Sequence, residues 1–276
     1  MTLRIGWFST GRGEGSQKLL RAAVDAIRDG RLDATIAFVF SNREPGQYAA
    51  TDTFFAQVES YGIPLITLSD SRFRKERGGE VARKGQPLPA WRMEYDREVV
   101  RLLGRFDCDI GVLAGYMLIG TEPLVRWRPL LNLHPAAPDG PSGTWQDVAW
   151  RLIETRADHS GVRIHLGTLT LDAGPIVTYC TYSLRGPTID LLWRAAGQRP
   201  LDQIKATDGE LFPLFQEIRR RGATRELPLL VETLRCLADG RIRIDGDQIF
   251  LGETRIVGGY DLTPEVEAAL ASPASR

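Results

Sequence analysis

The sequence predicts an α/β fold: a doubly wound, mostly parallel sheet followed by a small C-terminal α+β extension. Three observations favour this class. Strand-like apolar runs alternate with helix-like segments along the first half of the chain, which is typical of successive β-α-β units. Glycine-rich or polar residues follow several of these runs, where the loops of an open sheet bind ligands. The length of 276 residues fits one large domain, or one domain with an appendage.

The first half of the chain carries the strands of the expected sheet. Five strands are expected, at residues 3–9, 34–40, 65–68, 109–114 and 130–134. Apolar residues at helical spacing predict helices between them, at residues 19–30, 51–61 and 91–106. Residues 70–89 are charged and rich in glycine and arginine, so a surface loop is expected there.

The second half has shorter elements. A helix is expected at residues 144–154, and extended segments at residues 162–170 and 175–184. Helical spacing returns at residues 211–222 and 228–237. Residues 241–244 and 248–251, joined by Asp245-Gly246-Asp247, are expected to form a hairpin.

The change of character predicts a division of the chain near residue 184. Residues 1–184 are expected to form the core, and residues 185–276 an extension that packs on it. Residues 185–210 contain several glycines and prolines and show no clear period, so no element is expected there.

The composition excludes several classes of protein. Thirty-five basic and thirty-five acidic residues give a net charge of zero, which argues against a nucleic-acid surface built on overall charge. The three cysteines are far apart and form no CxxC pattern, so neither a disulfide framework nor a zinc site is expected, and a reducing cytoplasm is the natural location. No apolar run approaches the roughly 20 residues of a membrane span, and no membrane partner is expected.

Asn132 and His134 are the strongest candidates for chemistry. They lie two residues apart in a strand-like run that Pro135 closes, so both side chains are expected on one face of the strand. A carboxamide can donate a hydrogen bond to an oxyanion, and an imidazole can donate or accept a proton. The alternative is structural, because a histidine before a proline can simply cap the strand end.

Two further segments have a chemical and a structural interpretation. Asp172 lies 38 residues after His134 and precedes Ala-Gly-Pro, where an aspartate is usually a turn former. The glycine-rich turn at residues 11–16 follows a strand and precedes a helix, so its backbone N–H groups could hold a phosphate, or it could be a plain tight turn. His165 lies in an apolar run and is expected to pack, and His159 is expected to be solvated.

An ordered set of short motifs spans roughly residues 3–184. The motifs are Gly13-Glu14-Gly15-Ser16, Ser41-Asn42, Tyr95-Asp96-Arg97-Glu98, residues 109–117, Asn132-Leu133-His134-Pro135, residues 161–165 and residues 171–176. In their order and spacing the chain resembles the folate-dependent formyltransferases, and within them the branch that acts on phosphoribosylglycinamide. The resemblance implies a Rossmann-like formyltransferase fold, with residues 1–184 as the catalytic core.

The resemblance also implies an activity. Members of the family are expected to transfer a formyl group from 10-formyltetrahydrofolate, as a cosubstrate, to the amine of a phosphorylated small molecule. Phosphoribosylglycinamide, in purine biosynthesis, is the default acceptor. No metal is needed, and a cytoplasmic monomer or homodimer without a nucleic-acid partner is expected.

The family's functional residues map onto three groups of positions. The catalytic asparagine, histidine and aspartate fall on Asn132, His134 and Asp172. The pterin is expected to contact mostly backbone groups, at Tyr116, Met117, Leu118, Ile119, Thr170, Leu171, Ala173 and Gly174. The acceptor's phosphate is expected at Gly13, Glu14, Gly15 and Ser16.

Departures from the family pattern concern the acceptor. Leu118 stands where the family often has arginine, and Trp145-Gln146-Asp147 replaces a His-Thr-His. The family's late helix carries an acidic residue five positions before a proline, where it contacts the ribose. Two registers remain open, one on Pro213 with Asp208 and Lys205 nearby, the other on Pro228, which puts Ala223 at the acidic position.

Several functions therefore remain as alternatives. One is formylation of a different amine, such as an amino-sugar nucleotide, and another is hydrolysis of formyltetrahydrofolate. Formylation of an initiator tRNA is disfavoured by the zero net charge. A non-catalytic folate-binding protein is disfavoured by the complete set of asparagine, histidine and aspartate.

Overall fold

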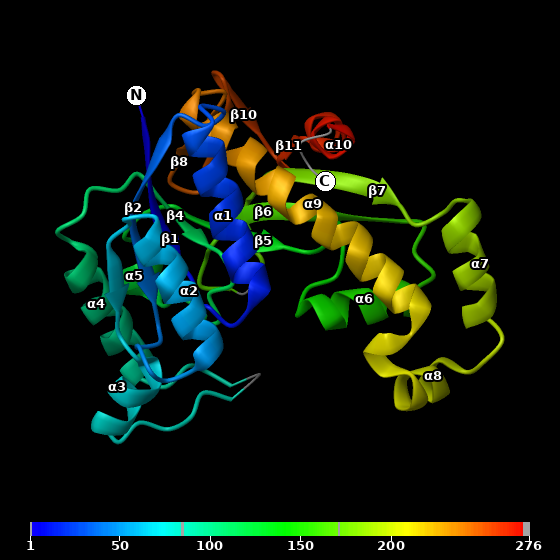
Figure 1. Cartoon of the computed structure of the whole chain (residues 1–276), viewed down its shortest axis with the longest axis horizontal. Coiled ribbons are helices and arrows are strands. Elements are labelled where there is room, and N and C mark those ends of the chain that lie inside the picture. The colour runs from blue at the N-terminus through cyan, green and yellow to red at the C-terminus, as the bar shows by residue number, and fades with distance from the viewer. Residues whose placement is uncertain (1, 84–85, 171, 273–276) are drawn as a thin grey trace. The chain divides into compact units, whose positions relative to one another are not determined.

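The computed structural model of the chain describes residues 2–83, 86–170 and 172–272. It forms two compact units, each assembled from several stretches of sequence (Figure 1). The first unit comprises residues 1–132, 166–174 and 234–247, and the second comprises residues 133–165, 175–233 and 248–276. The predicted division of the chain into a catalytic core and an extension at residue 184 is a different boundary from the one between these two units, and it stays a prediction.

Parallel strands form the sheet of the first unit. The strands are β1 (Leu3–Phe8), β2 (Ala34–Ser41), β3 (Leu65–Thr67), β4 (Ile110–Leu113) and β5 (Leu130–His134), whose last two residues belong to the second unit. Their order is β5-β4-β1-β2-β3, and every neighbouring pair in this order is parallel. All five lie where strands were expected, which confirms the predicted α/β class.

Helices cover both faces of this sheet. They are α1 (Glu14–Arg28), α2 (Ala49–Ser60), α3 (Asp70–Glu76), α4 (Trp91–Leu103) and α5 (Glu122–Val125). Phe8, Phe38 and Phe40 pack with buried residues of α3, α4 and α5. Because side chains alternate along a strand, Trp7 and Val39 point to the opposite face, which α1 and α2 cover (Figure 1). This arrangement confirms the doubly wound sheet.

Helix α3 differs from the loop that was expected over residues 70–89. Ser69 caps the helix, since its hydroxyl accepts a hydrogen bond from the backbone N–H of Arg72 at 3.2 Å. Phe73 buries its ring against Tyr95 of α4. A single buried aromatic in a charged seven-residue helix leaves no periodic signal, so the sequence pattern alone did not indicate it.

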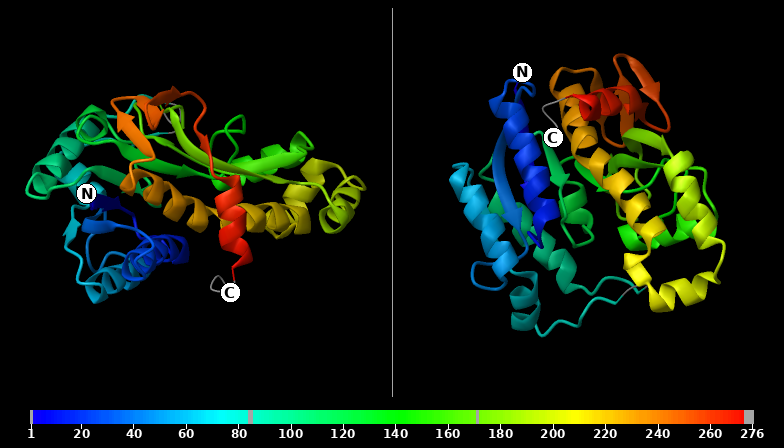
Figure 2. Two further views of the ribbon diagram at one scale, coloured as in Figure 1. Left: turned by 90° about the horizontal axis from the view of Figure 1, so that it is seen from above. Right: turned by 45° about the vertical axis from the view of Figure 1, so that its right-hand side comes forward.

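The second unit contains an antiparallel pair and several short elements. Strands β6 (His159–Leu166) and β7 (Ile176–Ser183) are antiparallel, β11 (Tyr260–Asp261) is parallel to β7, and β9 (Gln248–Leu251) pairs with β10 (Thr254–Ile256). Its helices include α6 (Trp145–Glu154), α7 (Pro187–Ala196), α8 (Leu201–Thr207) and α10 (Thr263–Ala271). Helix α10 packs beside β7, where the Thr263 hydroxyl accepts a hydrogen bond from the backbone N–H of Thr181 at 3.0 Å (Figure 2). These C-terminal strands and helices agree with the expected α+β extension.

Two helices occupy residues 185–210, where no element was expected. Pro187 opens α7, a position where the missing N–H of proline is harmless. Each helix buries one residue, Ile189 in α7 and Ile204 in α8. One buried residue per helix gives no amphipathic period, and for this reason the segment looked irregular.

Helix α9 (Pro213–Ala238) replaces the two helices expected at residues 211–222 and 228–237. Pro228 lies inside it, and an interior proline removes one intrahelical hydrogen bond. Leu229, Leu230 and Leu234, which follow the proline, are buried, so packing against the core supports the helix beyond this point. The 3₁₀ turn η1 (Gly209–Leu211) precedes α9, and β8 (Ile242–Asp245) follows it.

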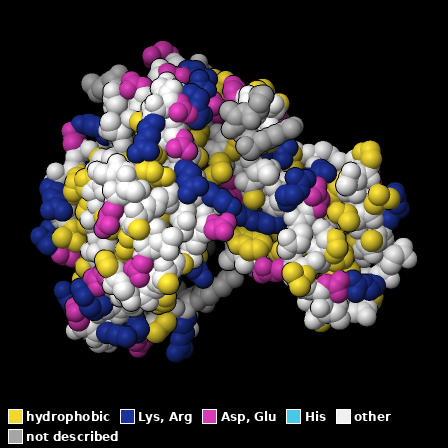
Figure 3. Space-filling view, in the orientation of Figure 1, with side chains coloured by type: hydrophobic (Ala, Val, Ile, Leu, Met, Phe, Trp, Pro, Cys, Tyr) yellow, Lys and Arg dark blue, Asp and Glu magenta, His cyan; other side chains and the backbone are white. Residues whose placement is uncertain are grey.

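Charged side chains of both signs are interspersed on the face of the molecule seen in Figure 3. Several ion pairs of the described residues join side chains of one helix, such as Lys18 and Glu14 at 2.9 Å and Arg126 and Glu122 at 3.1 Å. In the stretches of chain that the structure describes, no helix is both long enough and apolar enough to cross a membrane.

Candidate active site

Strand β5 presents Asn132 and His134 at its end. Leu130 and Leu131 anchor the strand in the core, each about 1% exposed, and Asn132 is partly exposed where the strand leaves it. His134 is 3% exposed. Two residues of strand separate the two side chains, so they share a face of β5, as the sequence predicts.

The ring of His134 is oriented by the backbone that follows it. Its Nε2 lies 3.0 Å from the carbonyl oxygen of Pro141. A carbonyl only accepts, so this contact favours a proton on Nε2. His165 of β6 packs edge-on against the ring, with 6.2 Å between the ring centroids. His165 is 2% exposed, in agreement with the expected packing role.

Asp172 lies in a tight turn of the first unit. Its φ is 55°, in the left-handed region that aspartate tolerates better than most residues. The backbone N–H of Ala173 reaches the carbonyl of Thr170 at 3.4 Å, and the Thr168 hydroxyl donates to the same carbonyl at 2.9 Å. Gly174 passes so close to the carbonyl of Leu166 that no side chain fits there. The turn is thus fixed at both ends; Leu171 lies outside the described residues.

The loop at residues 115–121, called the folate loop below because the family resemblance predicts pterin contacts at residues 116–119, is held through its backbone. The N–H of Met117 donates to the Thr10 hydroxyl at 2.9 Å, and the carbonyl of Ile119 accepts from Nη2 of Arg92 at 2.8 Å. Oδ2 of Asp96 accepts from the backbone N–H and the hydroxyl of Thr121, at 2.6 and 2.7 Å. The side chains of Met117 and Ile119 are exposed.

Arg92 and Asp96 form the buried support of this loop. They are 2% and 0% exposed, lie one turn apart on α4, and approach to 3.8 Å. Burial raises the pKa of Asp96, while the hydrogen bonds from Thr121 and the charge of Arg92 lower it. The sequence signal for this support is a pair of charged residues at i and i+4 on the apolar face of the helix, beside Tyr95 and Val99.

The glycine-rich turn at residues 11–16, called the glycine loop below, leads into the first turn of α1. Gly13 precedes the first helical residue, and a Cβ built on Gly13 or Gly15 would meet no atom within 4 Å. The start of this 15-residue helix therefore has open space beside Gly13 and Gly15, where an anion could lie, while the backbone N–H of Ser16 already donates to the carbonyl of Gly13 at 3.2 Å. Glu14 is exposed and pairs with Lys18, whereas Ser16 is buried.

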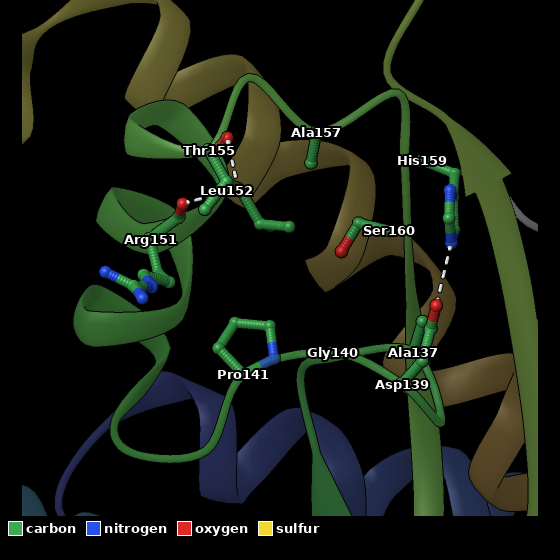
Figure 4. A pocket seen from close by; sticks show the side chains of 10 residues that line it. All are labelled: Ala137, Asp139, Gly140, Pro141, Arg151, Leu152, Thr155, Ala157, His159 and Ser160. Atoms are coloured by element: carbon green, nitrogen blue, oxygen red, sulfur yellow. Dashed lines mark hydrogen bonds and ion pairs between the residues drawn. The ribbon is translucent and has the colours of Figure 1, made fainter.

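A pocket of about 310 Å³ lies in the second unit (Figure 4). It is bounded by the 137–141 loop, the end of α6 and the start of β6. His159 and Asp139 face each other across its edge at 3.5 Å. Pro141, whose carbonyl holds His134, contributes to the wall, but none of the residues predicted for the site is among those that line the pocket.

The predicted site residues divide between the units. Asn132, Asp172, the folate loop and the glycine loop belong to the first unit, and His134 belongs to the second. Among the described residues, no group of three histidine, cysteine or acidic side chains is arranged to hold a metal ion.

Comparison with known proteins identifies relatives with the same arrangement of motifs. A family model described as formyl transferase matches residues 11–182. The phosphoribosylglycinamide formyltransferase of Escherichia coli (strain K12) is 28% identical over 168 residues, which are 60% of this chain and 66% of that protein. The trifunctional purine biosynthetic protein adenosine-3 of Homo sapiens is 26% identical over 216 residues, or 77% of this chain. This chain spans only 18% of the length of the human and bovine trifunctional proteins.

Solved structures share the fold. The phosphoribosylglycinamide formyltransferase of Coxiella burnetii superposes with a TM-score of 0.65 and 21% identity, covering 95% of this chain and 99% of that one. A formyltetrahydrofolate deformylase of Pseudomonas syringae pv. tomato gives a TM-score of 0.61 and 19% identity, covering 91% and 66%. The resemblance inferred from the motifs is confirmed, because the family model covers more than half of the 276 residues: the chain belongs to the formyl transferase family.

Proposed function

We propose that this chain transfers a formyl group from 10-formyltetrahydrofolate to the primary amine of a phosphorylated small molecule. The observation that carries the proposal is the family match over residues 11–182, which includes Asn132, His134 and Asp172. The relative in Escherichia coli, named a phosphoribosylglycinamide formyltransferase, supports phosphoribosylglycinamide as the default acceptor, in purine biosynthesis.

The residue types support a direct attack of the amine. The amine nitrogen bonds to the formyl carbon, and the carbonyl oxygen becomes a tetrahedral oxyanion. Asn132 is proposed to donate a hydrogen bond to this oxyanion, and His134 to donate a second one. When the bond from carbon to the folate nitrogen breaks, that nitrogen gains the proton that the attacking amine loses.

His134 and Asp172 are proposed to manage this proton. His134 is proposed to exchange a proton with the reacting groups, with its ring oriented by the contact of Nε2 with the carbonyl of Pro141. Asp172 is proposed to accept the amine proton, directly or through a water molecule, and to favour the charged imidazole. The left-handed turn, closed by Gly174, fixes the backbone that carries this carboxylate.

The two loops of the first unit are proposed to bind the two substrates. The N-terminus of α1, open at Gly13 and Gly15, is suited to the phosphate of the acceptor. The folate loop offers backbone groups to the pterin, and the turn at residues 170–174 offers others. Thr10, Arg92 and Asp96 form hydrogen bonds to the backbone of Met117, Ile119 and Thr121 in the folate loop. Because these bonds hold the loop in place, the other backbone groups, which we propose for the ligand, have a fixed direction.

One observation favours an acceptor other than phosphoribosylglycinamide. Pro228 lies within the long helix α9, which supports the register that puts Ala223 where the family has an acidic ribose contact. Trp145 packs on Phe215, with 5.8 Å between the ring centroids, and Arg219 lies over its ring at 5.0 Å. An aromatic and a cation therefore stand where the family has histidine. We propose a different phosphorylated amine, such as an amino-sugar nucleotide, as the second candidate.

The test is an assay of formyl transfer. Purified protein is incubated with 10-formyltetrahydrofolate and phosphoribosylglycinamide, an amino-sugar nucleotide, or no amine, while tetrahydrofolate release and formylated product are followed. Product with an amine supports the proposal and identifies the acceptor. Release of formate at the same rate without any amine would assign the chain to formyltetrahydrofolate hydrolysis instead.

A matched pair of variants ties any activity to the proposed site. His134→Ala should abolish transfer, whereas His159→Ala removes an exposed imidazole outside the predicted site and should leave transfer unchanged. Equal activity of the two variants would contradict the assignment of His134.

A further inference from the structure

Thr10 connects the two loops of the first unit. It follows β1 and precedes the glycine loop, and it is 2% exposed. Its hydroxyl accepts from the backbone N–H of Met117 at 2.9 Å and donates to Oδ1 of Asn42 at 2.7 Å. Its backbone N–H donates to the carbonyl of Gly115 at 3.1 Å. One buried residue thus bonds to both ends of the segment from Gly115 to Met117.

The two loops also touch directly. Gly115 has a φ of +71°, and a Cβ at this position would lie 2.8 Å from Oγ of Ser16 in the glycine loop. Only hydrogen atoms of Gly115 therefore separate the two loops at this point. The glycine loop and the folate loop meet directly at Gly115, and Thr10, which precedes the glycine loop, bonds to the folate loop through its hydroxyl.

The network extends to the strand beside them. Asn42 follows β2, is 4% exposed, and donates through Nδ2 to Oδ1 of Asp70 at 3.1 Å. The carbonyl of Thr10 accepts from the Thr51 hydroxyl at 3.4 Å. A displacement of Thr10 therefore breaks buried polar contacts to several segments at once, and a buried polar group without a partner is costly.

We infer that Thr10 is a positioning residue that couples the acceptor site to the folate site. A phosphate bound to the glycine loop restricts the motion of Thr10, and the Thr10 hydroxyl in turn restricts the motion of Met117. A ligand bound to the folate loop restricts the glycine loop through the same hydrogen bond. By thermodynamic reciprocity, each ligand strengthens the binding of the other by the same factor. This inference rests on the proposed function for the identity of the two ligands, but the physical link does not.

The variants are chosen to keep the shape of the residue. Thr10→Val has nearly the same volume but leaves the N–H of Met117 and Oδ1 of Asn42 without their partner. Thr10→Ser retains the hydroxyl. Thr178→Val is the matched control, because Thr178 is a fully buried threonine of the second unit whose hydroxyl bonds to that of Thr233 at 2.6 Å.

The first arm is hydrogen exchange without any ligand. Peptides covering residues 115–121 should exchange faster in Thr10→Val than in the parent, while Thr10→Ser and Thr178→Val should match the parent. Exchange of residues 115–121 at the parent rate in Thr10→Val would overturn the link, whatever the protein binds.

The second arm measures binding by titration calorimetry. Tetrahydrofolate is titrated into each protein with and without saturating phosphoribosylglycinamide. In the parent the acceptor should tighten tetrahydrofolate binding by at least about fivefold, the lower end of measured couplings. This factor should fall towards one in Thr10→Val, and stay near the parent value in Thr10→Ser and Thr178→Val.

The outcomes separate the two proposals. A parent coupling factor retained in Thr10→Val overturns the coupling role of Thr10 and leaves the proposed function standing. A parent that binds neither compound overturns the proposed function, and the exchange arm then decides the link by itself.

Discussion

At the scale of single residues, the carbonyl of Pro141 orients the ring of His134 through Nε2. Asn132 and His134 share one face of β5, and Asp172 lies in a strained turn that glycine closes. We expect Asn132→Ala, His134→Ala and Asp172→Ala each to lower kcat by about 10²–10³, the usual effect of losing a donor to an oxyanion. Steady-state kinetics on the accepted amine provides the measurement.

The three effects should not add. If the residues act on one transition state, the triple variant should be little slower than the slowest single variant. Tetrahydrofolate affinity should change much less than kcat, because backbone groups are proposed to hold the pterin. A His134→Ala protein with the kcat of the parent would refute the mechanism.

The cysteines offer a second test of side-chain environments. Burial raises the pKa of the Cys108 thiol to about 11 and that of Cys180 to about 12. Cys236 is also fully buried. Because the thiolate is the reactive form, we expect almost no reaction of the native protein with Ellman's reagent at pH 7.5. In denaturant all three thiols of the sequence should react; rapid reaction of the native protein would contradict the burial.

At the scale of elements, the glycine loop can be tested without disturbing the fold. Gly15→Leu introduces a side chain into space that is open in the structure, so the protein should fold normally. If the loop holds the acceptor's phosphate, the KM for the amine should rise about tenfold or more while tetrahydrofolate affinity stays within about twofold. Kinetics with varied amine and a folate titration supply the two quantities.

A matched control uses another glycine with room for a side chain. A Cβ on Gly104, at the end of α4, would have only ordinary contacts with carbonyls of its own helix. Gly104→Leu should therefore leave the amine KM unchanged. If the amine KM of Gly15→Leu equals that of this control, the loop is a simple turn and does not bind phosphate.

The elements that the sequence predicted are those with a strong local signal. Strands such as β1 and β2 are mostly apolar runs, and α1 has a continuous buried stripe that includes Leu20 and Val24. The missed helices α3 and α7 each bury one residue, so their stability comes from tertiary contacts and, in α3, from the Ser69 cap, neither of which a period reveals.

The same distinction holds for the site. Asn132, His134 and Asp172 were identified as residues, because their chemical types and order are visible in the sequence. Thr10 and Arg92 were not, because each acts through a hydrogen bond to a backbone group at least 27 positions away. Long-range contacts to backbone groups have no signature in a single sequence.

At the scale of the whole molecule, basic and acidic residues are equal in number, and particular ion pairs among them contribute to the free energy of unfolding. Hydrogen bonds from Arg220 and Arg221 lower the pKa of Glu217 to about 2, from its ordinary 4.5. A lowered folded-state pKa stabilises the fold fully above pH 4.5 and loses that contribution as the pH falls from about 4.5 to about 2. We expect Glu217→Gln to lose about 1–3 kcal/mol of unfolding free energy at pH 7 and almost nothing near pH 2.

The measurement is urea denaturation at a series of pH values. Between pH 5 and 2 the parent should lose stability more steeply than Glu217→Gln, since only the parent has this carboxylate to protonate. Glu210→Gln, an exposed acid of the same unit, is the control and should follow the parent. Parallel curves for Glu217→Gln and the parent would show that the arginine contacts contribute no stability.

The way in which the folate loop is held has a consequence for how its sequence changes during evolution. Its path is specified by Thr10, Arg92 and Asp96, which lie elsewhere in the sequence, while the side chains of Met117 and Ile119 point to solvent. Substitutions at Met117 and Ile119 should therefore accumulate freely among descendants of a common ancestor, even where the ligand is unchanged. Across an alignment of such chains, the invariant columns should be those of the supporting residues, and the binding loop itself should look unremarkable.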